Sequence, residues 1–121
     1  MKAIKITYWT TTAIVALIMA YSAYAYLTQD ALRAGFQHLG YPDYFRVELA
    51  IFKTIGAILL LAPVGNKVKE WTYAGFTIIF ISAFIAHTAS GDPLSMRIMP
   101  LVIMALLIAS YITYQRKLQA A

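Results

Sequence analysis

Long apolar runs dominate the chain and recur four times, separated by short polar stretches. They cover about residues 6–27, 44–62, 71–88 and 98–114. Each is close to the roughly 17–25 residues that an α-helix needs to cross a hydrocarbon core about 30 Å thick. The apolar positions are continuous instead of alternating, which favours helices over membrane strands. The pattern therefore predicts an all-α fold, a bundle of four transmembrane helices forming a single membrane domain over residues 1–121.

Glycine and proline residues fall between the runs, where helices are expected to end: Gly40, Pro42, Pro63, Gly65, Gly91 and Pro93. The second and third runs are joined by a short connection, so their helices are predicted to form an antiparallel hairpin. The longest connection, residues 28–43, places Leu32, Phe36 and Leu39 at helical spacing. This spacing predicts a short helix, or a loop with one helical turn, that lies in the membrane interface or covers one end of the bundle.

Composition narrows the class of protein further. Of the 121 residues, 61% are hydrophobic and 12% are charged, whereas an ordinary soluble domain has about 25% charged residues. A soluble fold of this length has too little interior to bury so much apolar surface, so we expect a lipid bilayer as its surroundings. The absence of cysteine excludes disulfides, thiolate metal sites and thiol catalysis within the sequence.

The net charge of +5 does not indicate nucleic-acid binding, because the basic residues flank the apolar runs. With four spans, six of them share the side of both termini: Lys2, Lys5, Lys67, Lys69, Arg116 and Lys117. Fewer lie on the other side, so both termini are predicted to be cytoplasmic. Aromatic anchors are expected at that inner boundary: Tyr8, Trp9, Trp71, Tyr73, Tyr111 and Tyr114.

A cleaved secretory signal ending near residues 23–25 is an alternative interpretation of the first apolar run, but this run is long for such a segment.

Charged residues inside the second run are the main functional signal. A charge near the centre of a membrane helix costs roughly 2.5–3.5 kcal/mol on insertion scales, so it usually faces the interior of the bundle. Counting from residue 44 at 1.5 Å per residue, Glu48 lies about 6 Å deep and Lys53 about 13 Å deep. His87 and Tyr24 fall at the level of Glu48, and Tyr21 approaches that of Lys53.

These groups are predicted to converge in the outer half of the bundle, while the inner half is expected to hold few polar groups. The candidate ligand-binding residues are Tyr24, Glu48, Lys53 and His87. Three more are secondary candidates: His38 in the loop above, Tyr21, and Arg46, which is shallow enough to extend to the interface.

A structural interpretation of the same residues stays open. Glu48 and Lys53 are alternatively a pair that holds helices together, although five residues turn a helix by about 140°, so their partners are expected on other helices. Tyr24 and His87 are the candidate partners. His38 and His87 lack metal-ligand spacing, Asp92 is most simply a turn residue, and no metal site is predicted. No nucleophile elbow, phosphate loop or dinucleotide motif is present, so no catalytic residue is assigned.

Several blocks resemble the DoxX-like family of small bacterial integral membrane proteins. They are residues 36–48 (FQHLGYPDYFRVE), 53–56 (KTIG), 69–76 (KEWTYAGF), 86–87 (AH) and 91–93 (GDP). The resemblance implies a four-helix membrane bundle in the bacterial inner membrane. Its recurring polar positions fall on Glu48, Lys53 and His87. One departure is Ile79, where relatives often carry a polar residue.

The family takes its name from subunits of a quinone-linked thiosulfate oxidoreductase, and some relatives resemble accessory or assembly proteins. Three functions therefore remain open. The first is an accessory or binding module whose outer polar pocket holds a lipophilic molecule such as a quinone, with no covalent cofactor. The second is a small membrane enzyme that uses Glu48 or His87 as an acid–base group and Lys53 to stabilise negative charge. The third is a structural subunit that associates with other membrane subunits or with copies of itself.

Overall fold

The computed structural model describes residues 2–120, and this part of the chain is helical apart from short connections. Its elements are α1 (Lys2–Thr28), α2 (Asp30–His38), α3 (Asp43–Leu61), α4 (Asn66–Ala89) and α5 (Leu94–Ala120). The prediction of an all-α fold is confirmed. The long helices extend past the apolar runs because the lysines, glutamate and arginine at their polar ends are also good helix formers.

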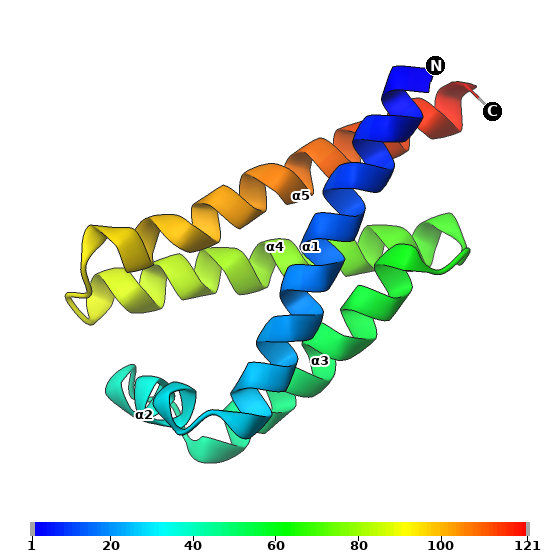
Figure 1. Ribbon diagram of the computed structural model, residues 1–121. Coiled ribbons are helices and arrows are strands. Elements are labelled where there is room, and N and C mark those ends of the chain that lie inside the picture. Colours follow the sequence, from blue (N-terminus) through cyan, green and yellow to red (C-terminus); the bar gives the residue numbers. More distant parts are fainter. Residues whose placement is uncertain (1, 121) are drawn as a thin grey trace.

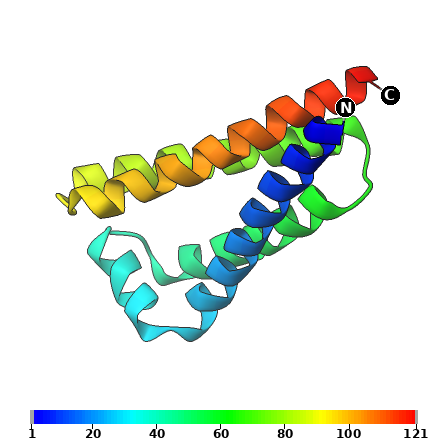
Figure 2. The same cartoon turned by 45° about the horizontal axis from the view of Figure 1, so that its top comes forward.

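The four long helices form two antiparallel pairs that share one end and diverge toward the other. In Figure 1, α4 and α5 run side by side, and α1 crosses them while lying along α3. Both termini and the α3–α4 connection lie at the shared end, which we call the terminal end. Helix α2 and the α4–α5 turn lie at the other, the α2 end, and Figure 2 shows the pairs separating toward it.

The hydrophobic core lies where all four long helices meet. Its fully buried side chains include Val15 and Met19 of α1, Leu60 of α3 and Leu107 of α5. Phe76 of α4 lies against Gly56 of α3, where a larger residue would not fit. Elsewhere, the facing sides of α3 and α4 leave an open groove, so these two helices pack less tightly than the predicted hairpin implies.

Helix α2 is amphipathic, with one side packed against the bundle and the other side exposed. Phe36 is buried, and Leu32 and Leu39 are half-buried, as their spacing predicts. The Phe36 ring packs edge-on against Tyr26 of α1, with 4.9 Å between ring centroids. Gly40 follows α2 with φ +86°, a conformation that residues with a Cβ rarely adopt, and this turn leads the chain into α3.

Within residues 2–120, three helices are long and apolar enough to cross a membrane: α1, α4 and α5. The predicted count of four spans is not confirmed, because α3 carries Arg46, Glu48 and Lys53 within its 19 residues. The interfacial position predicted for α2 is likewise not confirmed, although the helix itself is present.

Two expectations about the terminal end are wrong. Tyr8, Tyr73 and Tyr114 are buried in the core instead of anchoring the boundary, whereas Trp9 and Trp71 are exposed, as anchors are. The half of the bundle toward the terminal end, for which few polar groups were predicted, is also not apolar. Ser110 Oγ of α5 lies 2.6 Å from Thr12 Oγ1 of α1 and 2.7 Å from the Tyr73 hydroxyl of α4. These buried hydroxyl groups satisfy one another's hydrogen-bonding capacity. They therefore join three helices without any charged side chain.

Candidate functional site

Lys53 is the most unusual group at the α2 end because its amine is buried without an acidic partner. Its side chain points from α3 toward α1 and is 5% exposed. Lys53 Nζ donates to Ser22 Oγ at 2.8 Å and to the Tyr26 hydroxyl at 2.7 Å, and it lies 4.1 Å from the Tyr26 ring centroid. Within residues 2–120, no aspartate or glutamate forms a salt bridge with it. All its direct partners are therefore neutral.

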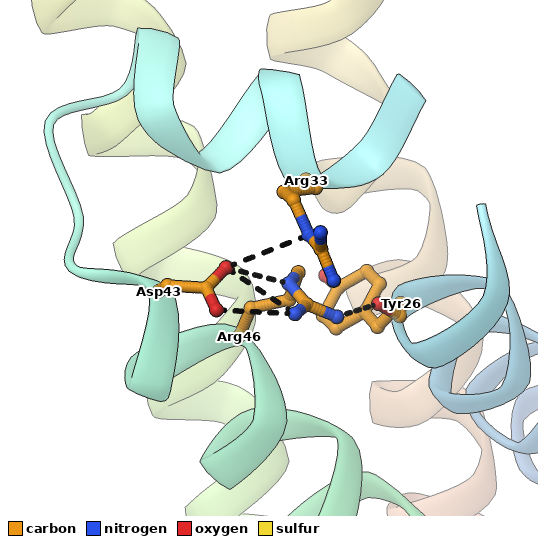
Figure 3. Close-up of polar contacts among 4 residues, drawn as sticks. All are labelled: Tyr26, Arg33, Asp43 and Arg46. Carbon is orange, nitrogen blue, oxygen red and sulfur yellow. Dashed lines mark hydrogen bonds and ion pairs between the residues drawn. The ribbon is translucent and has the colours of Figure 1, made fainter. Parts of the chain in front are cut away.

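A second buried cation, Arg46, joins the ends of α1 and α3 (Figure 3). It donates to the Tyr26 carbonyl oxygen at the end of α1 and to Asp43 Oδ1 at 3.2 Å. Arg33 of α2 approaches the same carboxylate at 3.8 Å. The prediction that Arg46 extends to the interface is wrong, because the side chain is 4% exposed and its guanidinium is bonded inside the protein. These contacts fix the position of Tyr26, whose hydroxyl meets Lys53.

The two histidines share one carboxylate. Asp92, in the α4–α5 turn, accepts hydrogen bonds from His87 Nδ1 at 2.6 Å and from His38 Nε2 at 2.7 Å. Asp92 is buried, His87 is mostly buried and His38 at the end of α2 is half exposed. Gly91 precedes it with φ +72°, which lets the turn present the carboxylate to both rings. The arrangement links α2 to the α4–α5 pair, and it assigns to Asp92 a role beyond that of a turn residue.

The shared hydrogen bonds make stability depend on pH. The hydrogen bond from His87, and to a smaller extent the one from His38, holds the pKa of the Asp92 carboxyl below its usual range. A lowered pKa in the folded state stabilises the protein above the unfolded value of about 3.9, and this contribution disappears as the pH falls through the folded pKa. We therefore expect Asp92→Asn to melt at a lower temperature than the wild type at pH 7, and the difference to shrink below pH 4. The difference in melting temperature is measured by thermal unfolding in detergent, followed by circular dichroism from pH 7 to pH 3. A difference independent of pH would contradict the assignment.

The structure separates the candidate residues into different places instead of one pocket. Glu48 is exposed on α3 and does not face Lys53. Tyr21 and Tyr24 are 65% and 62% exposed on α1. His87 contacts Asp92, and neither His87 nor Tyr24 is hydrogen-bonded to Lys53. The candidate site therefore consists of two polar centres at the α2 end: Lys53 with its hydroxyl partners, and Asp92 with its two histidines.

Residues that the sequence analysis missed complete these centres. Ser22 and Tyr26 stand four residues apart on one face of α1, a spacing that does signal a shared polar face in an apolar helix. Ser22 also lines a shallow hollow of about 460 Å³ beside Tyr21, Gln29 and Leu32. The hollow places an opening on the surface of α1 next to a direct partner of Lys53.

Among the described residues, no three His, Asp or Glu side chains are placed to share a metal ion. Asp92 and its histidines are instead at hydrogen-bond distances from one another.

Comparison with known proteins agrees with the helical membrane architecture. No curated protein and no solved structure matches the chain. The model of the DoxX-like family matches residues 10–110, which include the four long helices in large part and both polar centres. With helices apolar enough to span a bilayer and a family match over most of its length, this membrane protein belongs to the DoxX-like family.

Proposed function

We propose that the protein is an accessory binding module of the bacterial inner membrane that holds a lipophilic molecule with a polar head group, such as a quinone. The observation that carries this proposal is Lys53, a buried cation with neutral partners alone. Placing a lysine at the centre of a membrane helix costs roughly 2.5–3.5 kcal/mol on insertion scales, and such residues usually mark a binding or transport site.

The number of N–H donors on the Lys53 ammonium group indicates that the ligand supplies a hydrogen-bond acceptor. A lysine ammonium has three N–H donors, and two of them reach Ser22 and Tyr26. The third has no acceptor among the residues described by the structure. A carbonyl oxygen is a suitable acceptor, because a hydrogen bond from a charged donor is stronger than one between neutral groups. A quinone ring provides such an oxygen on a flat apolar body.

The hollow beside Ser22 is the proposed position of the head group. There a ring contacts Tyr21 and the Ser22 hydroxyl, which already accepts a hydrogen bond from Lys53. Lys53 itself does not line the hollow, so the carbonyl oxygen has to pass Ser22 to reach the third N–H of the ammonium group. Tyr24, Glu48 and His87 remain candidate binding residues in this proposal, although they do not contact Lys53 directly.

A four-span topology with both termini in the cytoplasm is part of the proposal. The charges that distinguish α3 from the other long helices are largely satisfied inside the bundle, since Arg46 and Lys53 are both buried. Beyond Glu48, which is exposed near its start, its outward side is largely apolar, with Ile51, Ile55 and Ile58 each about half exposed. A helix with such a surface is able to face lipid despite its polar sequence.

Substituting Lys53 tests the binding site. Lys53→Met should lower quinone binding by at least about tenfold, because a charge-assisted hydrogen bond contributes roughly 1.5–3 kcal/mol. Binding is measured by equilibrium dialysis of the protein in lipid nanodiscs with a short-chain ubiquinone, and an azido-quinone should label the peptide around residues 21–29. Lys5→Met, which removes an exposed lysine, is the matched control. Equal binding by both variants, or labelling confined to other helices, would refute the site.

A second function, that of a small membrane enzyme, is favoured by one contact. Asp92 lies 2.6 Å from His87 Nδ1, and a carboxylate in this position orients a histidine so that its other nitrogen exchanges protons. A substrate turnover that disappears in Asp92→Asn, with binding retained, would support this alternative, with His87 as the acid–base group out of the two candidates, Glu48 and His87, predicted from the sequence. Retention without turnover supports the binding module.

A further inference from the structure

An apolar groove lies between α3 and α4, on a part of the molecule that neither polar centre uses. Its volume is about 620 Å³, and its walls are almost wholly apolar. Phe52 and Ile55 of α3 form one wall, and Trp71 and Gly75 of α4 contribute to the other. Because both helices have lipid-facing surfaces, an open groove here is a place for hydrocarbon.

The groove lies beside a point where a small residue lets the two helices approach closely. Phe76 lies against Gly56, which brings the backbones together at that level. Gly75, the neighbour of Phe76, faces the groove, and a Cβ added there would meet no atom within 4 Å. The position beside the contact is therefore empty of protein side chains.

One end of the groove carries a positive charge. Lys67 is the charged residue among those lining it, and its side chain is exposed near the α3–α4 connection. Glu70, one turn further along α4, accepts hydrogen bonds from Tyr111 at 3.0 Å and Gln115 at 2.6 Å, so its carboxylate is held toward α5. In the chain from residue 2 to 120, no salt bridge involves Lys67.

The length of the groove corresponds to one leaflet of a bilayer. At 1.5 Å per residue, the stretch of α4 from Lys67 to Ile79 rises about 18 Å. Half of a hydrocarbon core about 30 Å thick is close to this length. Trp71, 82% exposed, stands one turn from Lys67, at the level where tryptophan side chains meet lipid head groups.

We propose that this groove binds an anionic phospholipid of the leaflet at the terminal end, with one acyl chain between α3 and α4 and the phosphate at Lys67. An uncharged quinone gains little from the lysine, and a zwitterionic lipid gains less than an anionic one. This lipid site does not depend on the quinone site at Lys53, since the two lie on different surfaces and involve different residues.

Quenching of Trp71 by brominated lipids tests the proposal in the full chain. Trp9→Phe removes the other tryptophan and serves as the parent protein, reconstituted in vesicles with dibrominated phosphatidylglycerol or phosphatidylcholine. In the parent, phosphatidylglycerol should associate about fivefold more strongly than phosphatidylcholine, as expected for one lysine near an anionic lipid. Lys67→Gln should remove this preference, whereas Lys5→Gln at the same end should preserve it.

Gly75→Leu tests the position of the acyl chain, because its side chain enters the groove from a position where an added Cβ meets no protein atom within 4 Å. It should reduce quenching of Trp71 by both lipids, while Ala74→Leu, on the adjacent exposed position, should leave quenching unchanged. Equal association of the two lipids with the parent, or equal quenching of the two leucine variants, would overturn the proposal. Displacement of the brominated lipid by ubiquinone, or a changed oligomeric state in Gly75→Leu, would assign the groove to another occupant and also overturn it. Lys53→Met should not alter the lipid preference. A failure of the lipid site at Lys67 is therefore distinguished from a failure of the quinone site at Lys53.

Discussion

Gly56→Val is expected to lower the free energy of unfolding by about 3 kcal/mol, at the upper end of what overpacking of a core usually costs. A Cβ at this position would lie 2.6 Å from Phe76 Cε1 and closer still to Cζ. Phe76 is 2% exposed and packed within the core, so its ring has little room to turn away. Relief therefore requires α3 and α4 to move apart. Titration with sodium dodecyl sulfate in mixed micelles, followed by circular dichroism, measures the change.

Gly75→Val is the matched control for this prediction. It makes the same substitution in a neighbouring helix, where an added Cβ meets no atom within 4 Å. Both variants share the intrinsic helix preference of valine over glycine, so the difference between them reports the contact with Phe76. The double variant Gly56→Val/Phe76→Leu should recover part of the loss, because leucine leaves more space for the added methyl groups. Equal stability of the two valine variants would show that the α3–α4 contact does not restrict the fold.

Local patterns predicted the elements well because each element is determined by nearby residues. The apolar runs identified the long helices, and the spacing of Leu32, Phe36 and Leu39 identified the buried side of α2. Gly91 ended α4 as expected, with the positive φ that glycine tolerates. The number of spans was less certain, because hydropathy counts Arg46 and Lys53 as polar wherever their side chains point.

The composition of the polar centres depends on helix packing, which these patterns do not contain. The turn of about 140° between Glu48 and Lys53 indicated that they face different directions. Which α1 side chains meet Lys53 depends on the rotation and depth of α1 against α3, and the answer is Ser22 and Tyr26 instead of Tyr24. The tyrosines of the terminal end were misinterpreted for a similar reason, since an apolar ring with a hydroxyl suits either a core or an interface.

Lys69→Met is expected to destabilise the protein by about 2 kcal/mol, although methionine is the more apolar residue. Lys69 lies in the first turn of α4. Its side chain is 4% exposed and reaches back to the end of α3. There Nζ donates to the carbonyl oxygens of Leu59 at 2.9 Å and Leu60 at 2.5 Å. The last carbonyls of a helix have no partner within the helix, and a cation there also interacts favourably with the helix dipole.

The expected loss follows from what remains after the substitution. Methionine removes the cost of burying a charge, but it leaves carbonyl groups near Leu60 without a donor, and each unsatisfied buried group costs roughly 1–3 kcal/mol. Lys67→Met is the control, because that lysine is exposed two residues earlier and should change stability by no more than about 0.5 kcal/mol. Both variants are compared with the wild type by the same detergent titration. If Lys69→Met were as stable as Lys67→Met, the buried lysine would not be what holds the end of α3 against α4, and the packing of Phe76 on Gly56 would have to do so alone.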